Sequence, residues 1–305
     1  MSGLRGHVED YLGLRRALGF KLERAGRLLP QFVNYLEAAG AATVTTELAI
    51  AWARQPVSAS PRHWAARLAV VRGFAAYLQT LDPEAEVPPP GVFPARRHRP
   101  TPYLWSQQDI SRLLEGARAL RSPMRAATHE ALFGLLAVSG MRVGEAIALQ
   151  REDVDLEAGV ITIHQAKFDR SRFVPLHPSA TEALRCYAAE RDRLCPRPRS
   201  NTFFISSVGT GLGRSDVTAT LRKITIALGL RTETVRPRTH DLRHSFAVHA
   251  LVEWQRSGVV DEHIAMLSTY LGHVAPSDTY WYLSASPELM GLAAERLGAR
   301  DGAPR

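Results

Sequence analysis

The stretch AVSGMRVGEAIAL, residues 137–149, places an arginine and a glutamate within an otherwise apolar run. Gly140 interrupts the helical pattern, and Arg142 and Glu145 follow three residues apart, on one face of the next helix. An arginine beside apolar residues must be paired or must bind an anion, because an unpaired buried charge is costly. The stretch leaves two interpretations open: a structural ion pair, or an anion-binding arginine that Glu145 orients.

A second stretch, THDLRHSFAVH, residues 239–249, reads as part of a helix. His240 and Arg243 are three residues apart, so both can reach one anionic group. His240 and His244 have the spacing of a metal-ligand pair, but no third ligand of a suitable kind lies nearby in the sequence. The helix therefore favours anion binding, and we expect no metal.

The stretch LGHVAPSDTYWYLS, residues 271–284, carries two tyrosines two residues apart. On an α-helix such positions point to nearly opposite faces, so at most one of Tyr280 and Tyr282 can serve a given site. Both could also be core aromatics, together with Trp281 between them. Helical periodicity does not choose between the two tyrosines.

A β-hairpin is predicted by GVITIHQAKFDRSRFVPLH, residues 159–177. GVITIH and RFVPL alternate or are β-branched, and polar residues lie between them. Lys167 falls at the predicted tip, where a side chain can reach out of the fold, although an ordinary turn lysine is the plain alternative. The chain has only two other lysines, Lys21 and Lys223, so a lysine in a site stands out.

In this order along the chain, the stretches resemble the motifs of the tyrosine recombinases, the phage integrase family. The TGxRxxE-like box of the family is similar to SGMRVGE, with Arg142. Its hairpin lysine is similar to Lys167 before RFVPL, and its H-x-x-R box to HDLR, with His240 and Arg243. Each box alone is weak evidence, whereas the ordered set is strong.

The last box of the family is LGH, followed nine residues later by the nucleophile, which is similar to His273 and Tyr282 here. This resemblance selects Tyr282 and leaves Tyr280 a packing role. Two departures stand out. The hairpin reads AKFDRSR instead of a GKG-type turn, and TYWYLSASPELM differs from the common T-x-x-Y-x-H ending and is similar to a transposon-associated branch.

The resemblance implies a reaction in which a tyrosine attacks a DNA phosphodiester, forms a 3′-phosphotyrosyl link and releases a 5′-hydroxyl, with no metal, ATP or other cofactor. The implied catalytic set is Tyr282, the nucleophile, with Arg142, Lys167, His240, Arg243 and His273. In it the arginines stabilise the charge of the transition state and the lysine protonates the leaving oxygen. The first histidine assists proton transfer, and the second hydrogen-bonds the phosphate.

Composition sets the broad class of protein. The chain has 305 residues, 45% hydrophobic and 22% charged, which describes a soluble globular protein with room for two domains. The net charge of +8 favours a polyanionic partner, nucleic acid above all, with solubility as the plain alternative. Two cysteines give no disulfide framework, and no apolar run approaches the ~18 residues of a membrane span. We therefore expect a cytoplasmic, nucleoid-associated protein without a membrane partner.

The hydrophobic pattern predicts a mainly α fold with a small antiparallel β-sheet. Residues 1–82 read as helical, 83–102 as a Pro-rich basic linker and 103–305 as a mixed, mainly helical region. The resemblance implies that 1–82 form a core-DNA-binding (SAM-like) domain and 103–305 the catalytic domain. Ser60 and either Thr45 or Thr46 are expected to cap helices at their N-termini, and Gly40 to end one.

Further arginines are candidate contacts for the DNA backbone. In the fourth predicted helix, Arg62, His63 and Arg67 can share a broad outward face, although a solvated helix face is an equal alternative. The candidate DNA contacts are Arg62, Arg67, Arg96, Arg97, Arg99, Arg170 and Arg172.

These features predict a site-specific recombinase for integration, excision or transposition of a mobile element. The resemblance implies double-stranded DNA as partner and a homotetramer on paired DNA sites, with sibling recombinases as further candidates. Two alternatives stay open at this stage: DNA relaxation of the type IB topoisomerase kind, and a non-catalytic DNA-binding accessory protein.

Overall fold

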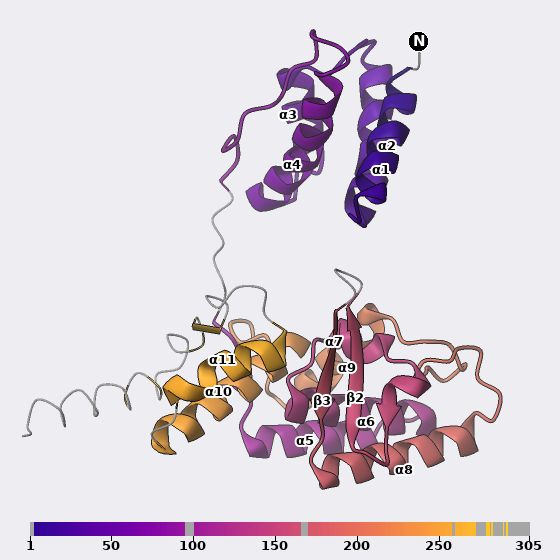
Figure 1. Cartoon of the computed structure of the whole chain (residues 1–305), viewed down its shortest axis with the longest axis vertical. Helices are drawn as coiled ribbons and strands as arrows, with labels where there is room; N and C mark the ends of the chain where they lie inside the picture. The colour runs from indigo at the N-terminus through magenta and orange to yellow at the C-terminus, as the bar shows by residue number, and fades with distance from the viewer. Residues whose placement is uncertain are drawn as a thin grey trace, which may run out of the picture. The chain divides into compact units, whose positions relative to one another are not determined.

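The structure is a computed structural model that describes residues 3–94, 101–165, 170–257 and 260–272, with five further positions: 279, 280, 282, 289 and 291. The chain divides into two compact units, Met1–Arg99 and Pro100–Arg305 (Figure 1). Each unit has a hydrophobic core of its own. Their boundary falls inside the segment predicted as a linker.

The described part of the first unit is helical, as predicted, with α1 (Leu4–Ala17), α2 (Glu23–Ala38), α3 (Thr46–Arg54) and α4 (Pro61–Leu78). The predicted caps are confirmed. Thr45 accepts a hydrogen bond from the backbone N–H of Leu48, and Ser60 from that of His63. Gly40 follows α2 with φ 68°, a conformation that glycine adopts without strain.

Part of the predicted linker packs on the first unit instead of standing free. Ala85 and Phe93 are buried in its core. The Phe93 ring lies 5.8 Å from that of Trp64, and the N–H of Glu86 donates to the Val44 carbonyl at 2.8 Å. The prolines of this segment are interspersed with apolar side chains, and burial of these side chains stabilises the packed arrangement.

The expectation that Arg67 lies on an outward face is wrong. Its side chain is buried: the guanidinium lies 3.7 Å above the Trp52 ring and donates to the Trp52 carbonyl at 3.1 Å. Burial, and then the charge of Arg24, lower the pKa of Arg67. Arg67 shares a helix face with buried Val71, whereas Arg62 is exposed, so only Arg62 keeps a position suited to a DNA contact.

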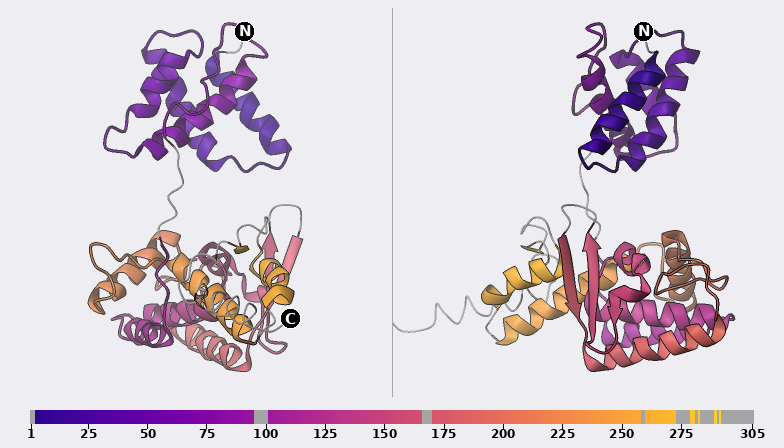
Figure 2. Two further views of the ribbon diagram at one scale, coloured as in Figure 1. Left: turned by 90° about the vertical axis from the view of Figure 1, so that its left-hand side faces the viewer. Right: turned by 45° about the vertical axis from the view of Figure 1, so that its right-hand side comes forward.

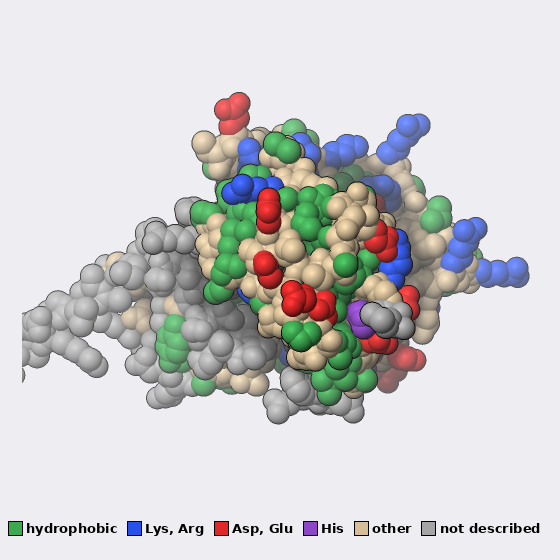
Figure 3. Space-filling view, turned by 90° about the horizontal axis from the view of Figure 1, so that it is seen from above, with side chains coloured by type: hydrophobic (Ala, Val, Ile, Leu, Met, Phe, Trp, Pro, Cys, Tyr) green, Lys and Arg blue, Asp and Glu red, His purple; other side chains and the backbone are tan. Residues whose placement is uncertain are grey.

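Charged side chains of both signs share the face that Figure 3 shows. A net charge of +8 therefore does not make this face a uniformly basic surface.

The second unit is mainly helical. Its described helices are α5 (Gln107–Arg118), α6 (Pro123–Ser139), α7 (Val143–Ala148), the 3₁₀ helix η1 (Arg151–Asp153), α8 (Pro178–Leu194), α9 (Arg214–Ala227), α10 (Thr239–Ser257) and α11 (Val260–Leu271). None of the helices in the described part of the chain is both long and apolar enough to cross a bilayer.

The small sheet confirms the predicted hairpin and adds one strand. β2 (Val160–Gln165) and β3 (Arg170–Pro175) pair antiparallel, with Ile163 opposite Arg172. β1 (Val154–Asp155) lies antiparallel beside β2, which gives the order β1-β2-β3. Two residues are too few to show the alternation of a strand, and for this reason the sequence did not predict β1.

Helix α6 runs through the main core of the second unit and contacts α5, α8 and α10 (Figure 2). A smaller apolar cluster joins α10 to α11 and includes Leu251, Leu271 and Tyr282. Helix α10 contacts both α6 and α11. It therefore brings the motif residues that follow α6 close to the C-terminal end of α11.

Candidate active site

The end of α6 is shaped so that Arg142 follows it in a fixed position. Gly140 has φ 60°, and a Cβ at this residue would lie 2.5 Å from the Phe246 ring. Ser139 accepts a hydrogen bond from the backbone N–H of Met141. A glycine is required here by both the backbone angle and the close approach of Phe246. The chain then turns directly into α7, with Arg142 at its N-cap.

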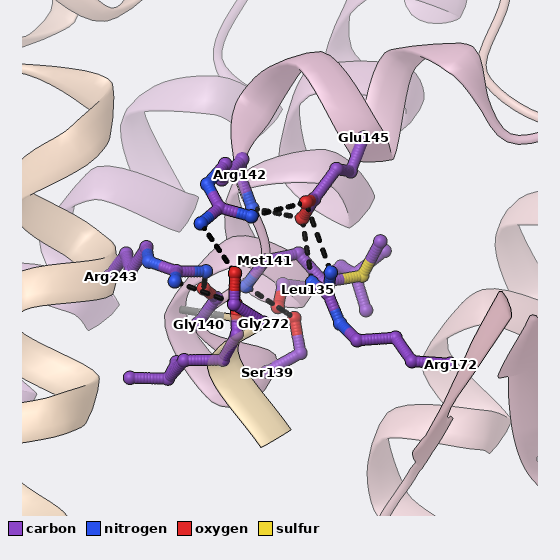
Figure 4. Close-up of polar contacts among 10 residues, drawn as sticks. Leu135, Ser139, Gly140, Met141, Arg142, Glu145, Arg172, Arg243 and Gly272 are labelled. Atoms are coloured by element: carbon purple, nitrogen blue, oxygen red, sulfur yellow. Dashed lines mark hydrogen bonds and ion pairs between the residues drawn. The ribbon is translucent and has the colours of Figure 1, made fainter. Parts of the chain in front are cut away.

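Glu145 holds Arg142 by its backbone and by its side chain (Figure 4). One carboxylate oxygen accepts from the backbone N–H of Arg142 at 2.9 Å, and the other accepts from its guanidinium at 2.8 Å. The ion pair with Glu145 is therefore present and fixes the direction of the guanidinium, and anion binding by Arg142 stays a prediction. The guanidinium also donates to the Gly272 carbonyl at 2.9 Å.

Arg243 enters the same place from α10 and is 1% exposed. Its two terminal nitrogens donate to the carbonyls of Gly140 at 2.8 Å and Leu271 at 2.7 Å (Figure 4). These carbonyls lie at the C-terminal ends of two helices: Gly140 follows α6, Leu271 ends α11 and Gly272 follows it. The C-terminal end of a helix favours a nearby cation, because its carbonyls are unpaired and the helix dipole is negative there.

Burial and nearby charges change the pKa of Arg243. Burial, and then the charge of Arg142, lower the pKa of Arg243 to about 10. Tyr282 and Glu145 act in the opposite direction, Tyr282 by charge and by a hydrogen bond. A group with this pKa is still protonated at neutral pH, so Arg243 remains cationic.

The structure distinguishes the two tyrosines that periodicity left equal. Tyr282 is 2% exposed and Tyr280 is 55% exposed. The Tyr282 ring lies 5.3 Å from His244, edge to face, and the His244 ring lies 4.5 Å from His240. Tyr282 is therefore the tyrosine that lies with Arg243.

His240 shares this cluster while part of its side chain meets solvent. Burial among its neighbours, and then the charge of Arg243, lower the pKa of His240. The imidazole is therefore neutral at neutral pH and able to accept a proton. No group of three His, Cys, Asp or Glu side chains suited to a metal occurs among the described residues.

Several predicted site residues lie outside the described part of the chain. They are Lys167 and His273 of the catalytic set and, among the candidate DNA contacts, Arg96, Arg97 and Arg99. Arg170 begins β3, but its side chain is outside the description. The roles of these residues stay predictions.

Arg172 is turned toward Glu145 and not toward solvent. Its side chain is 12% exposed, and both terminal nitrogens bond Glu145, at 3.1 and 2.8 Å. The signal was present in the sequence: Arg172 and the buried Val174 are two apart in a strand, and such residues share a face. The prediction overlooked this alternation because a charged residue was assigned to the surface.

Residues of α9 were not among the predicted contacts. The side chains of Arg214, Ser215, Thr218, Arg222 and Lys223 line an open hollow on this helix. A Cβ on Gly144 would lie 2.5 Å from the Arg214 guanidinium, so Arg214 reaches across to α7 beside Arg142. The spacing of basic residues along 214–223 was the signal in the sequence that could have indicated this hollow.

A buried tyrosine beside Arg243, close to the fixed Arg142 and on a helical domain with a small sheet, defines a recognisable class of protein. A sequence model described as "Phage integrase family" matches residues 105–288, more than half of the chain. The chain therefore belongs to the phage integrase family of tyrosine recombinases. Membership of this family supports site-specific recombinase activity.

Its relatives agree with this assignment. The Sinorhizobium fredii protein named "Putative integrase/recombinase y4rB" is 45% identical over 309 residues, which cover 98% of each chain. The XerH site-specific recombinase bound to palindromic difH substrate shares the fold with TM-score 0.62 and 21% identity, over 82% of this chain and 70% of that chain. The Tn1549 transposon integrase in complex with transposon right end DNA has TM-score 0.63 and 16% identity, over 96% and 99% of the two chains.

Proposed function

We propose that the protein cleaves and rejoins DNA strands at specific sites through a 3′-phosphotyrosyl intermediate, with Tyr282 as the nucleophile. The observation that carries this proposal is the contact of the buried Tyr282 with the buried Arg243, next to the partly exposed Arg142. A hydroxyl beside fixed cations suits attack on a phosphodiester, because the cations stabilise the negative charge that develops.

The two arginines would bind the non-bridging oxygens of the scissile phosphate. A guanidinium has five N–H donors, and the carbonyl and carboxylate contacts of Arg142 and Arg243 engage only some of them. Their direction is set before DNA arrives, so little reorganisation is needed in the transition state. Loss of one donor group of this kind typically reduces the rate about 10²–10³-fold.

Tyr282 would lose its proton as it attacks the phosphorus. An ordinary tyrosine has a pKa of about 10 and is a weak nucleophile at neutral pH. The neighbouring Arg243 favours the phenolate, because an opposite charge stabilises the ionised form. His240 is a candidate acceptor for the proton, and the resemblance assigns protonation of the 5′-oxygen to Lys167 and a phosphate hydrogen bond to His273.

Double-stranded DNA is the proposed partner. The net charge of +8 supports it. So do two solved structures with the same fold, the XerH recombinase bound to palindromic difH substrate and the Tn1549 transposon integrase in complex with transposon right end DNA. The family resemblance adds three parts to this proposal. The protein acts as a homotetramer on paired DNA sites, and sibling recombinases are further members of the assembly. The reaction moves a mobile element.

The proposal is tested with a nicked suicide substrate that carries the recombination site, taken from DNA flanking the gene. The wild-type protein is expected to form a covalent protein–DNA adduct that resists denaturant and yields to protease. Tyr282→Phe removes the attacking hydroxyl and should abolish the adduct. Tyr280→Phe alters an exposed residue and should leave the adduct in place.

Two results would contradict parts of the proposal. Absence of the adduct with wild-type protein and the correct site would refute strand cleavage. An adduct that survives Tyr282→Phe would refute only the choice of nucleophile. Relaxation of a plasmid that lacks any specific site would instead favour an activity of the topoisomerase kind.

A further inference from the structure

One carboxylate, that of Glu145, serves two arginines at once. Arg142 donates to it from α7 by backbone and side chain, and Arg172 donates to both of its oxygens from strand β3 (Figure 4). The side chains of Glu145 and Arg172 are 17% and 12% exposed. Two positive charges and one negative charge therefore meet at this point, and the pair farther from the solvent is Glu145 with Arg172.

Arg172 sets the net charge of the group formed by Glu145, Arg142 and Arg172. Burial alone would raise the pKa of Glu145, but the bonds from Arg172 and Arg142 outweigh it and lower the pKa. Glu145 is therefore ionised at neutral pH. A carboxylate with only Arg142 as partner would cancel the charge of that arginine, whereas a carboxylate already matched by Arg172 leaves the group with one net positive charge.

We propose that Arg172 is a positioning residue of the recombinase reaction: it neutralises Glu145, so that Glu145 orients Arg142 without cancelling the positive charge that Arg142 presents to the scissile phosphate. This inference rests on the proposed function. It replaces a direct DNA contact by Arg172, because both terminal nitrogens of Arg172 face Glu145 and its side chain is largely buried.

The arrangement also ties the sheet to the site. Strand β3 contacts α11, and Arg172 lies close enough to Tyr270 of α11 for its charge to oppose the raising of the Tyr270 pKa by burial. Arg172 thus connects β3, α7 and α11, the elements that carry or support Arg142. If Arg172 only connected these elements, its loss would change folding and DNA affinity. If Arg172 neutralises Glu145, its loss changes the rate of the chemical step.

A double-mutant cycle separates these two effects. The variants are Arg172→Met, Glu145→Gln and the two combined, and the readout is the rate of adduct formation on the suicide substrate at saturating protein. Arg172→Met is expected to slow this step about ten- to a hundredfold, because an unmatched carboxylate near the phosphate opposes its developing charge. DNA affinity should change by less than about threefold, since Arg172 makes no DNA contact.

The combined variant is the decisive one. If Arg172 acts by neutralising Glu145, removing the charge of Glu145 in the Arg172→Met protein should restore much of the lost rate. If Arg172 only holds the fold together, the two losses should add. Additive losses, or a loss that lies in DNA affinity alone, would overturn the inference. Arg172→Lys keeps the charge and should retain more activity than Arg172→Met.

Matched controls come from an exposed ion pair of the same unit. Arg193 and Glu190 lie 2.6 Å apart on α8, with side chains 67% and 38% exposed. Arg193→Met, Glu190→Gln and their combination should leave the rate unchanged. Any rate change in this set would show that loss of an arginine alone, without regard to its place, slows the reaction.

A second measurement keeps the inference separate from the proposed function. The same proteins are titrated with inorganic phosphate and followed by NMR, with Arg142→Ala as the reference for loss of the site. Arg172→Met should weaken phosphate binding at this site several-fold, and Glu145→Gln in that background should restore it. A wild-type protein that binds phosphate but forms no adduct would refute the proposed function, and equal binding by all variants would refute the role of Arg172.

Discussion

At the scale of single residues, the site works by giving each charge a defined partner. Arg243 is fully buried, yet its pKa of about 10 leaves it charged at neutral pH. Carbonyl groups take much of the place of the water that it loses on burial. Arg243, the proposed ligand of the scissile phosphate, is therefore already desolvated in the free protein, and its field is stronger than in water.

His129 provides a pH-dependent term in stability that is independent of catalysis. It lies in α6, is 2% exposed, and burial, the largest influence, lowers its pKa. In the unfolded chain a histidine binds a proton below about pH 6.5, whereas folded His129 binds one only at lower pH. The free energy of unfolding should therefore fall as pH falls through this window.

The prediction is that His129→Gln reduces this dependence. Urea unfolding at several values between about pH 5 and pH 8 would measure it. The slope of stability against pH below about 6.5 should be smaller in the variant than in the wild type. Because the pKa of His240 is lowered as well, part of the slope should remain. An unchanged slope would contradict the burial of a neutral His129.

At the scale of elements, the turn after α6 is the feature most sensitive to a small change. Gly140→Ala would bring a methyl group to 2.5 Å from Phe246 and 3.0 Å from Leu271, at φ 60°. We expect a loss of about 2–4 kcal/mol in the free energy of unfolding, from left-handed strain together with overpacking. Adduct formation should also fall, because the Gly140 carbonyl holds Arg243.

Gly229 offers the matched control for this prediction. It has φ 70°, but a Cβ there would meet no atom within 4 Å. Gly229→Ala should therefore show the conformational cost alone, about 1–2 kcal/mol, with activity retained. Chemical denaturation measures both variants, and equal losses would mean that the contacts around Gly140 relax without cost.

The elements also show how far sequence reasoning reaches. Local patterns predicted the helices, the caps and the hairpin, because periodicity and capping depend on neighbours in the chain. The ordered boxes brought Arg142, Arg243 and Tyr282 together because a family resemblance carries tertiary information. Arg67 and Arg172 were misplaced because their partners, Trp52 and Glu145, lie far away in sequence, although alternation with the buried Val174 already indicated the inward face for Arg172.

At the scale of the whole molecule, the two units have separate cores and should unfold separately. Leu29 belongs to the core of the first unit and Leu132 to that of the second, and both are 0% exposed. Leu29→Ala and Leu132→Ala each remove buried methyl groups, at a cost of about 2–5 kcal/mol.

Calorimetry should therefore resolve two transitions in the wild-type protein. Leu29→Ala should lower the temperature of one transition, and Leu132→Ala that of the other. Each variant thus serves as control for its partner. A single transition that both substitutions shift equally would mean that the units fold as one cooperative body.

The carbonyls of Leu271 and Gly272 give α11 a role beyond packing. Arg243 and Arg142 each bond one of them, across sequence separations of 28 and 130 residues. The main core of the second unit is built from residues before α11, apart from the partly buried Tyr270 packed against it. If α11 detaches, that core can persist while both arginines lose an anchor. Detachment of α11 would thus abolish the proposed strand cleavage while the main core of the second unit stays folded.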